Sequence, residues 1–276
     1  WTIPKEPIAL AATTVQSASF VANWSASTGA TGYYLDVSTN PAFGSYVTGW
    51  DSTSVGGVAT YTVNTNISSG TVYYYRVRAN NGGAKSGYSG VISVTTAPAA
   101  PTAGNATSVG KSSFTANWAA STGATKYFLD VATTSGFTGA YVTGYQNLDV
   151  GNTTSASVNG LALGVTYYYQ VRAFNSNGTS INSGTKSALT LPSPPAVLPV
   201  TVVGETNFTA SWNAVSDAAG YYLDVSTASD FSSFVPTWQD VPVVALTSKS
   251  VNTNLSAGTT YYFRVRTYNA TGASDY

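Results

Sequence analysis

The stretch FVANW at residues 20–24 decides the fold, because it recurs as FTANW at 114–118 and as FTASW at 208–212. The tryptophans that end the three copies are 94 residues apart: Trp24, Trp118 and Trp212. Repeats that must stack to be stable have periods of about 20 to 50 residues, whereas roughly 100 residues make an independent domain. The sequence therefore predicts three tandem copies of one small domain.

Each copy has the residue alternation of β-strands. In FVANW, three residues share one face, as a half-buried strand requires: Phe20, Ala22 and Trp24. The segments YYLDV at 33–37 and VYYYRVRA at 72–79 alternate in the same way, and both recur with the same period. Their outer faces are expected to lie in water, with Asp36 among the outward residues. With shorter runs between turn clusters, about seven strands fit in each copy, which predicts an all-β sandwich.

Three features together resemble the fibronectin type III domain: a Trp on the second strand, a Tyr-rich third strand, and the run ISSGTVYYYRVRA at 67–79. The resemblance covers essentially the whole chain and is greatest to repeats of secreted and cell-surface proteins of bacteria. It implies three tandem immunoglobulin-like sandwiches, with the three tryptophans in their cores. It also implies tyrosine-corner residues, whose hydroxyls bond to nearby backbone: Tyr73, Tyr167 and Tyr261.

Prolines at the same position of each copy, Pro7, Pro101 and Pro195, indicate short and semi-rigid linkers. The predicted organisation is a tail at 1–4, then repeats at 5–97, 98–192 and 193–276. The third repeat stops at the equivalent of Tyr88 and lacks its last strand. Because an open sheet edge invites pairing, we expect the chain to continue in both directions; the alternative is a strand donated by another subunit.

Composition excludes several classes of function. Eleven basic and eleven acidic residues give zero net charge, and the basic residues are scattered, so neither nucleic acid nor membrane insertion is expected. The chain has no Cys and no His, which removes disulfides and the commonest metal ligands and general base. No nucleophile with a base and no phosphate-binding loop is recognisable. We therefore predict no catalytic, cofactor or metal site, and thus not an enzyme.

The Asp of the YYLDV segment occurs once per repeat, opposite a strand that carries Arg. We expect a surface ion pair there, with the Arg present in all three repeats as the better partner: Arg78, Arg172 and Arg266. Exposed pairs of this kind contribute about 0 to 1 kcal/mol and mainly help register.

Outward aromatic residues are the best candidates for contacts. They are expected to form one exposed pair per repeat: Tyr34 with Tyr74, Phe128 with Tyr168, and Tyr222 with Tyr262. Such rings can stabilise neighbouring strands, bind sugar rings or contact another rod, and the sequence favours the first of these roles. The aromatics of the variable middle segment are assigned to the core: Trp50, Tyr145 and Trp238.

Glycan attachment is a further possibility. The pattern Asn-x-Ser/Thr occurs at several positions and is a weak signal in so Asn- and Thr-rich a chain: Asn23, Asn66, Asn105, Asn152, Asn177, Asn207, Asn254 and Asn269. The triplet DST at 51–53 similarly makes Ser52 a candidate for O-glycosylation.

Three like domains without reactive residues favour a non-catalytic extracellular or cell-surface rod, part of a longer adhesive or filament-forming protein. Its partners would be other domains of that chain, with like subunits or surface polysaccharide as further possibilities. One alternative is a spacer or carbohydrate-contacting array in a secreted polysaccharide-degrading enzyme. A second is a self-assembling filament or envelope-layer subunit.

Overall fold

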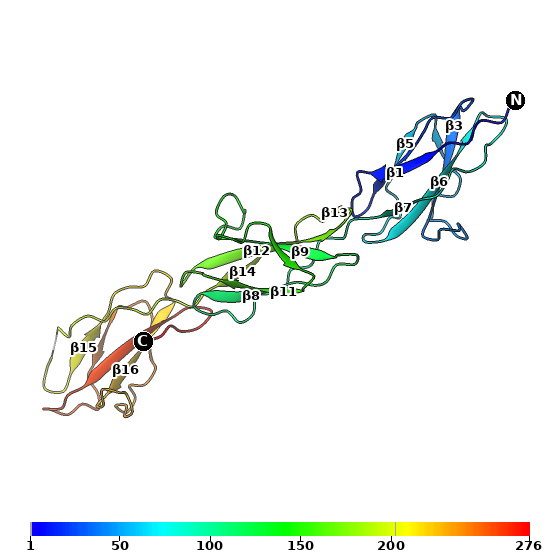
Figure 1. Ribbon diagram of the computed structural model, residues 1–276. Helices are drawn as coiled ribbons and strands as arrows, with labels where there is room; N and C mark the ends of the chain where they lie inside the picture. The colour runs from blue at the N-terminus through cyan, green and yellow to red at the C-terminus, as the bar shows by residue number, and fades with distance from the viewer. Residues whose placement is uncertain (1, 202) are drawn as a thin grey trace.

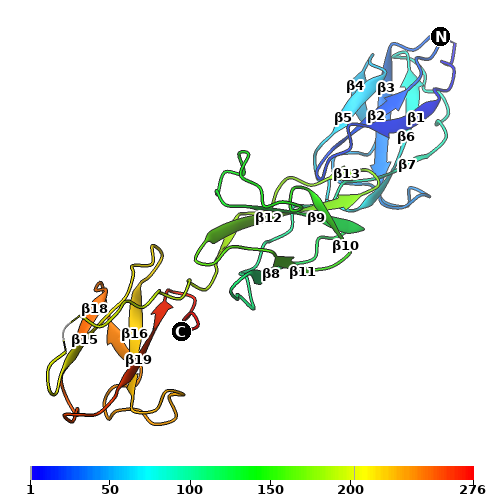
Figure 2. The ribbon, with the colours of Figure 1, turned by 60° about the vertical axis from the view of Figure 1, so that its left-hand side comes forward.

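A computed structural model describes residues 2–201 and 203–276, so Trp1 of the predicted tail lies outside the described residues. Within these ranges every regular element is a β-strand. Three β-sandwiches follow one another in an elongated row (Figures 1 and 2). Each has its own cluster of buried residues, and the three clusters share no residue.

The first repeat packs a three-stranded sheet on a four-stranded sheet, with antiparallel pairing throughout. The smaller sheet has the order β1 (Ala9–Thr13), β2 (Phe20–Trp24) and β5 (Thr60–Val63). The larger sheet has the order β4 (Thr53–Gly56), β3 (Gly32–Ser38), β6 (Val72–Asn80) and β7 (Ile92–Thr95). These seven strands are the number that the sequence predicts.

The second repeat keeps this plan. One sheet pairs β8 (Ser113–Asn117) with β11 (Ser155–Asn159). The other contains β10 (Leu148–Gly151), β9 (Lys126–Ala132), β12 (Thr166–Asn175), β13 (Gly178–Thr179) and β14 (Lys186–Leu189). Here β14 pairs with β12 as β7 pairs with β6.

The third repeat pairs β15 (Phe208–Ser211) with β18 (Ser248–Val251) in one sheet. Its second sheet has the order β17 (Val241–Val243), β16 (Gly220–Ser226) and β19 (Tyr262–Tyr268). Among its described residues no strand corresponds to β7 or β14.

The cores lie where the alternation places them. In β2 the residues Phe20, Ala22 and Trp24 are buried while the residues between them are partly exposed. Trp24 packs on Tyr33 with ring centroids 5.6 Å apart, and the other repeats hold the same contact at 5.8 and 5.4 Å. Truncating such a buried aromatic to Ala costs about 3 to 5 kcal/mol, so this contact is a principal source of each sandwich's stability.

A tyrosine hydroxyl fixes the turn before β6, β12 and β19, the equivalent strands of the three repeats. The Tyr73 hydroxyl accepts a hydrogen bond of 2.7 Å from the Ser68 N–H, five residues earlier. The same bond holds the turn before β12, from Ala162 N–H to Tyr167, and the turn before β19, from Ser256 N–H to Tyr261. The hydroxyl thereby gives a backbone N–H of the turn a protein partner and ties the turn to the strand that follows.

Candidate interaction surfaces

The described part of the chain holds no cluster of three His, Cys, Asp or Glu side chains able to bind a metal ion. Over the same ranges, no helix has the length and hydropathy needed to cross a bilayer. The candidate sites are therefore surfaces and joints.

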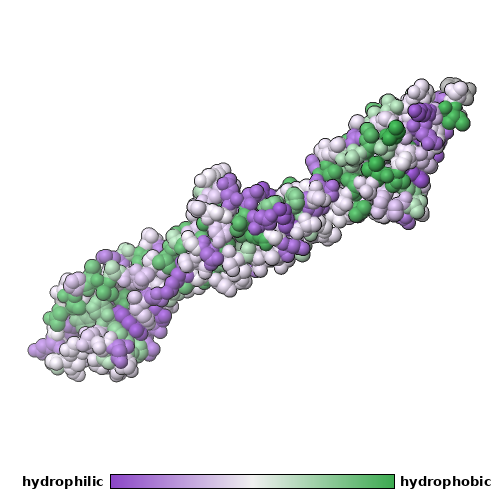
Figure 3. All heavy atoms as spheres, in the orientation of Figure 1, coloured by the Kyte–Doolittle hydropathy of each residue, from purple (hydrophilic) through white to green (hydrophobic). Residues whose placement is uncertain are grey.

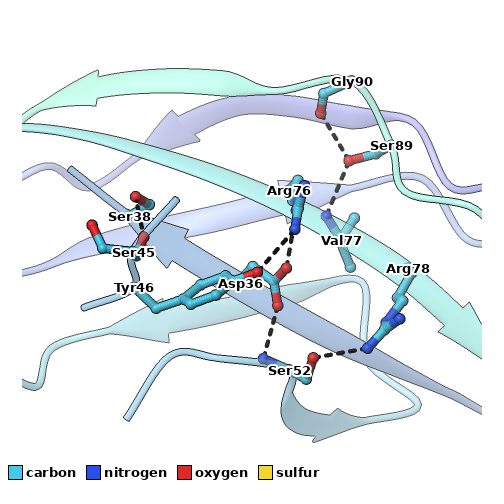
Figure 4. Close-up of polar contacts among 10 residues, drawn as sticks. All are labelled: Asp36, Ser38, Ser45, Tyr46, Ser52, Arg76, Val77, Arg78, Ser89 and Gly90. Carbon is cyan, nitrogen blue, oxygen red and sulfur yellow. Dashed lines mark hydrogen bonds and ion pairs between the residues drawn. The ribbon is translucent and has the colours of Figure 1, made fainter. Parts of the chain in front are cut away.

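The Asp of β3 is buried, contrary to the prediction of a surface ion pair. Asp36 has no exposed surface, and its Oδ2 accepts a hydrogen bond of 2.9 Å from Arg76 Nε (Figure 4). Its Oδ1 accepts a second bond of 2.8 Å from the backbone N–H of Ser52. One carboxylate thus joins two strands to the loop that follows β3. Its two hydrogen bonds and the opposite charge of Arg76 offset the free-energy cost of burying a charged group.

The identity of the Arg also differs from the prediction. Arg76 lies directly opposite Asp36 in the register, whereas the predicted partner, Arg78, lies opposite Tyr34 and bonds to Ser52 Oγ. The third repeat is the same, with Arg264 Nε 2.8 Å from Asp224 and Arg266 on Asp240.

Only the second repeat uses the predicted Arg. Gln170 lies directly opposite Asp130, at the position that holds Arg in the other two repeats. Its side-chain amide donates to Asp130 Oδ2 over 3.2 Å. Arg172 then reaches the same oxygen over 3.1 Å. The Asp therefore pairs with the Arg that lies directly opposite it on the neighbouring strand. Where that position holds an uncharged residue, the Arg two positions further along the strand takes its place.

Loops covering the outer face explain why Asp36 is buried. The Arg76 guanidinium lies between two aromatic rings, 4.1 Å from the centroid of Phe43 and 3.7 Å from that of Tyr88. Burial lowers the pKa of Arg76, but the hydrogen bond and charge of Asp36 outweigh it and raise the pKa above its ordinary value. Two residues from loops far apart in sequence thus close over the pair, and strand alternation carries no sign of this covering.

The predicted aromatic pairs do not form. Tyr34 lies opposite Arg78, and Tyr74 lies opposite Ser38, so the Asp36 pair separates the two rings. The first ring of each predicted pair has a different partner. Tyr222 packs on Tyr268 with ring centroids 4.7 Å apart, and Phe128 packs edge-on against Phe174 with centroids 5.8 Å apart. In the first repeat Lys85 Nζ covers Tyr34 at 4.3 Å. The second ring of each predicted pair is half-buried in Tyr74 and Tyr168 and exposed in Tyr262.

The middle-segment aromatics lie in or against the cores. Trp50 and Trp238 are buried, and each donates its indole N–H to a backbone carbonyl, of Thr65 and Thr253 respectively. Tyr145 packs partly buried against the second core, and its hydroxyl accepts from the Asn159 N–H.

The candidate glycan sites differ in accessibility. Asn269 is buried and its Nδ2, the atom that would carry a glycan, donates to Thr190 O. Asn23 is half-buried and its Nδ2 is likewise bonded to backbone. Ser52 is half-buried, with its hydroxyl accepting from Arg78. The remaining sites are exposed and stay predictions: Asn66, Asn105, Asn152, Asn177, Asn207 and Asn254.

A recurring hydrogen bond ties each repeat to the chain before it. Buried Asn175 donates from Nδ2 to Thr96 O, at the end of the first repeat, over 3.0 Å. Asn269 makes the same bond to Thr190 O over 2.9 Å. In the first repeat Asn81 bonds to the carbonyl of Thr2, in the predicted tail. The 79-residue separation is constant, so the bond is a property of the repeat that sequence reasoning missed.

Close contacts at a glycine also join adjacent repeats, with backbone at the first joint and with a side chain at the second. At the first joint, Gly70 has a positive φ of 59°, and a Cβ there would lie 2.1 Å from Thr122 O. At the second joint, a Cβ on Gly164 would lie 1.8 Å from Asp217 Oδ2. Lys111 and Asp275 form an ion pair across this joint as well. Adjacent repeats are therefore in direct contact, and at the first joint, where the neighbouring atoms belong to the backbone, the close approach requires glycine.

Comparison with known proteins places these features in a family. A family model described as "Fibronectin type III domain" matches residues 99–188 and 193–276, more than half of the chain. The chain is 31% identical to "Exoglucanase B" of Cellulomonas fimi over 96% of this chain and 24% of that protein. It is 31% identical to "Fibronectin type III domain-containing protein 7" of Mus musculus, over 66% of this chain and 22% of that protein.

A "Kelch domain-containing protein" of Sulfurisphaera tokodaii is 32% identical over 49% of this chain and 19% of its own length. The chain thus spans a quarter or less of the length of these relatives. Among solved structures, the FN1–FN3 domains of chicken CNTN1 match with a TM-score of 0.34 and 18% identity, over 99% of this chain and 95% of that one.

Proposed function

Because this chain belongs to the fibronectin type III family, we propose that it is a non-catalytic, extracellular structural rod. It forms part of a longer cell-surface, adhesive or filament-forming protein and holds the domains on either side at a set distance. Domains of this family are in general non-catalytic, which supports the role.

The observation that carries the proposal is the repeated joint. At both joints a buried Asn side chain bonds to the residue that follows the last strand of the preceding repeat, and a glycine lies in direct contact with the next repeat. A buried amide that loses its partner costs about 1 to 3 kcal/mol, so bending a joint away from this geometry is unfavourable. Stiff joints keep the three domains in line, so that the ends of the chain stay at a fixed distance, as a spacer requires.

Distances between spin labels test the stiffness. The chain has no cysteine, so Thr62→Cys and Ser155→Cys, both on exposed residues, place one label on each side of the first joint. We expect one narrow distance distribution by pulsed electron spin resonance, and a clearly broader one after Asn175→Ala. The exposed Asn64→Ala is the matched control and leaves the distribution narrow. A broad distribution in the parent chain would contradict a rod.

A second candidate is a spacer that contacts carbohydrate within a secreted polysaccharide-degrading enzyme. The similarity to Exoglucanase B along nearly the whole chain favours it, together with partly exposed rings such as Tyr168 and Tyr262. Co-sedimentation with insoluble cellulose tests it. Binding that is lost in the Tyr168→Ala, Tyr262→Ala double variant supports this role, and failure to bind at all removes it while leaving the rod intact.

A further inference from the structure

The first repeat has a small polar slot beside Tyr34, on the outer face of its larger sheet. The slot has a volume of about 200 Å³ and is lined by Tyr34, Asn80, Gly82, Gly83, Ala84 and Lys85. Most of this lining belongs to the turn after β6, which lies at the end of the repeat where Asn81 bonds to Thr2. Hydrophilic side chains gather at this end (Figure 3).

An aromatic ring occupies the corresponding place in the other two repeats. Phe174 packs against Phe128 with ring centroids 5.8 Å apart, and Tyr268 packs on Tyr222 with centroids 4.7 Å apart. By the 94-residue period, Phe174 and Tyr268 correspond to Asn80. Because the side chain of Asn is shorter than that of Phe or Tyr, the slot is the space that the second ring leaves open.

The backbone beside the slot is the same as in the third repeat. Gly32 lies opposite Asn80 in the register, as Gly220 lies opposite Tyr268. A Cβ on Gly32 would lie 3.0 Å from Asn80 Nδ2, and a Cβ on Gly220 would lie 2.5 Å from the Tyr268 hydroxyl oxygen. The residue at position 80 therefore decides whether the slot is filled or open.

A preceding repeat leaves this place accessible. At the first joint the turn after β12 touches the repeat before it, since a Cβ on Gly178 would lie 3.3 Å from Ala97 Cβ. The counterparts of Gly82, Gly83 and Lys85 are nevertheless exposed there: Ser176, Asn177 and Thr179. Access to the slot thus does not depend on whether another repeat precedes the first.

Two cations beside the slot have no carboxylate partner. Lys85 Nζ lies 4.3 Å from the centroid of the Tyr34 ring, and the Arg78 guanidinium carbon lies 5.7 Å from it. Within residues 2–201 and 203–276 neither cation forms an ion pair, whereas Arg266, the counterpart of Arg78, pairs with Asp240. None of the residues that line the slot is acidic. The slot therefore favours an anionic ligand.

The lining groups match the parts of an acidic sugar. The Tyr34 ring offers an apolar face for the C–H groups of a sugar ring, and the Asn80 side-chain amide can bond to its hydroxyls. Lys85 is exposed, and its flexible side chain can turn from the Tyr34 ring to a carboxylate.

We propose that the slot binds a hexuronic acid unit of a polysaccharide. The sugar ring lies on Tyr34, in the place that Phe174 and Tyr268 take in the other repeats, and its carboxylate pairs with Lys85. This site gives the first repeat a ligand of its own, and it depends neither on the stiffness of the joints nor on Tyr168 and Tyr262.

Titration with methyl β-D-glucuronide, followed by the backbone amide NMR shifts of Gly82 and Gly83, tests the site. We expect saturable shifts with a Kd on the order of 1 mM, as for a ligand of this size. Methyl β-D-glucoside lacks the charge and sodium acetate lacks the ring, so each should bind at least ~10-fold more weakly at equal ionic strength. An equal response to either, or no response to the glucuronide, would overturn the proposal.

Three variants locate the binding. Asn80→Tyr recreates the ring pair of the third repeat and should abolish binding, while Lys85→Gln should weaken it at least ~10-fold. Lys249→Gln removes an equally exposed lysine from the third repeat and should leave the affinity unchanged. Undiminished binding by Asn80→Tyr, with a melting temperature that verifies folding, would exclude the slot. The spin-label distances measure the rod separately, so failure of the site and failure of the rod are distinguishable.

Discussion

A single carboxylate per repeat organises the outer face of the larger sheet. Asp36 is buried and accepts one bond from a strand and one from a loop, and the same pattern recurs at Asp130 and Asp224. The residue that supplies the loop N–H has a positive φ in all three repeats: Ser52, Asn147 and Asp240. Left-handed backbone is unfavourable for these residues, and the bond to Asp offsets this cost. The Asp therefore determines the loop conformation as well as the strand register.

Removing this carboxylate tests its role. Asp36→Ala leaves Arg76 and the Ser52 N–H without their partner, and we expect a loss of roughly 3 kcal/mol, the lower end for a broken buried pair, because Arg76 keeps some contact with water. Amide hydrogen exchange at β3 and β6 in increasing urea measures the stability of the first repeat separately from the other two. Asp51→Ala, on an exposed neighbouring carboxylate, is the control and should change stability little. Equal effects of the two substitutions would contradict the role.

At the scale of the elements, the strands are those that alternation predicts, and the connections carry the specific chemistry. Strand β6 is the longest of its repeat, and Tyr73 at its start bonds back to the turn that precedes it. Its neighbour Tyr74 points to the opposite face, opposite Ser38. Two adjacent tyrosines therefore have distinct roles, one holding the entry to the strand and one covering the outer face.

The two tyrosines give a matched test. Tyr73→Phe deletes the acceptor of the Ser68 N–H, and losing this hydrogen bond at an exposed turn residue is expected to cost about 0.5 to 1.5 kcal/mol. Tyr74→Phe removes a hydroxyl from the partly exposed face and should be nearly neutral. Denaturation midpoints measure both, and amide hydrogen exchange at Ser68 should rise only in the first variant. Protection of Ser68 in Tyr73→Phe would argue against this bond.

At the scale of the whole molecule, the joints decide shape. Three sandwiches of about 30 Å each, from strands rising about 3.3 Å per residue, give a rod on the order of 100 Å if the joints hold them in line. The row in Figure 1 has this arrangement. The direct contact of Gly70 with the next repeat is the feature most sensitive to an added side chain.

Two glycines with the same backbone separate joint packing from backbone strain. Gly70→Ala and Gly258→Ala both place a side chain at positive φ, at roughly 1 kcal/mol each. Only at Gly70 would the methyl group collide with the following repeat. Small-angle X-ray scattering of dilute chains should show a changed maximum dimension for Gly70→Ala and none for Gly258→Ala. The same profile for both variants would mean that the joint does not depend on this contact.

Local patterns in the sequence are enough to predict the number of repeats, the all-β architecture, the strand faces and the core aromatics. These follow from a 94-residue period and from two-residue alternation, which are local properties of a chain. What covers those faces depends on contacts between distant segments, which are visible in the folded chain alone. Asp36 is buried because Phe43 and Tyr88, from separate loops, close over Arg76. The Asn bonds at the joints likewise join residues 79 positions apart, across two domains, and alternation contains no information about such contacts.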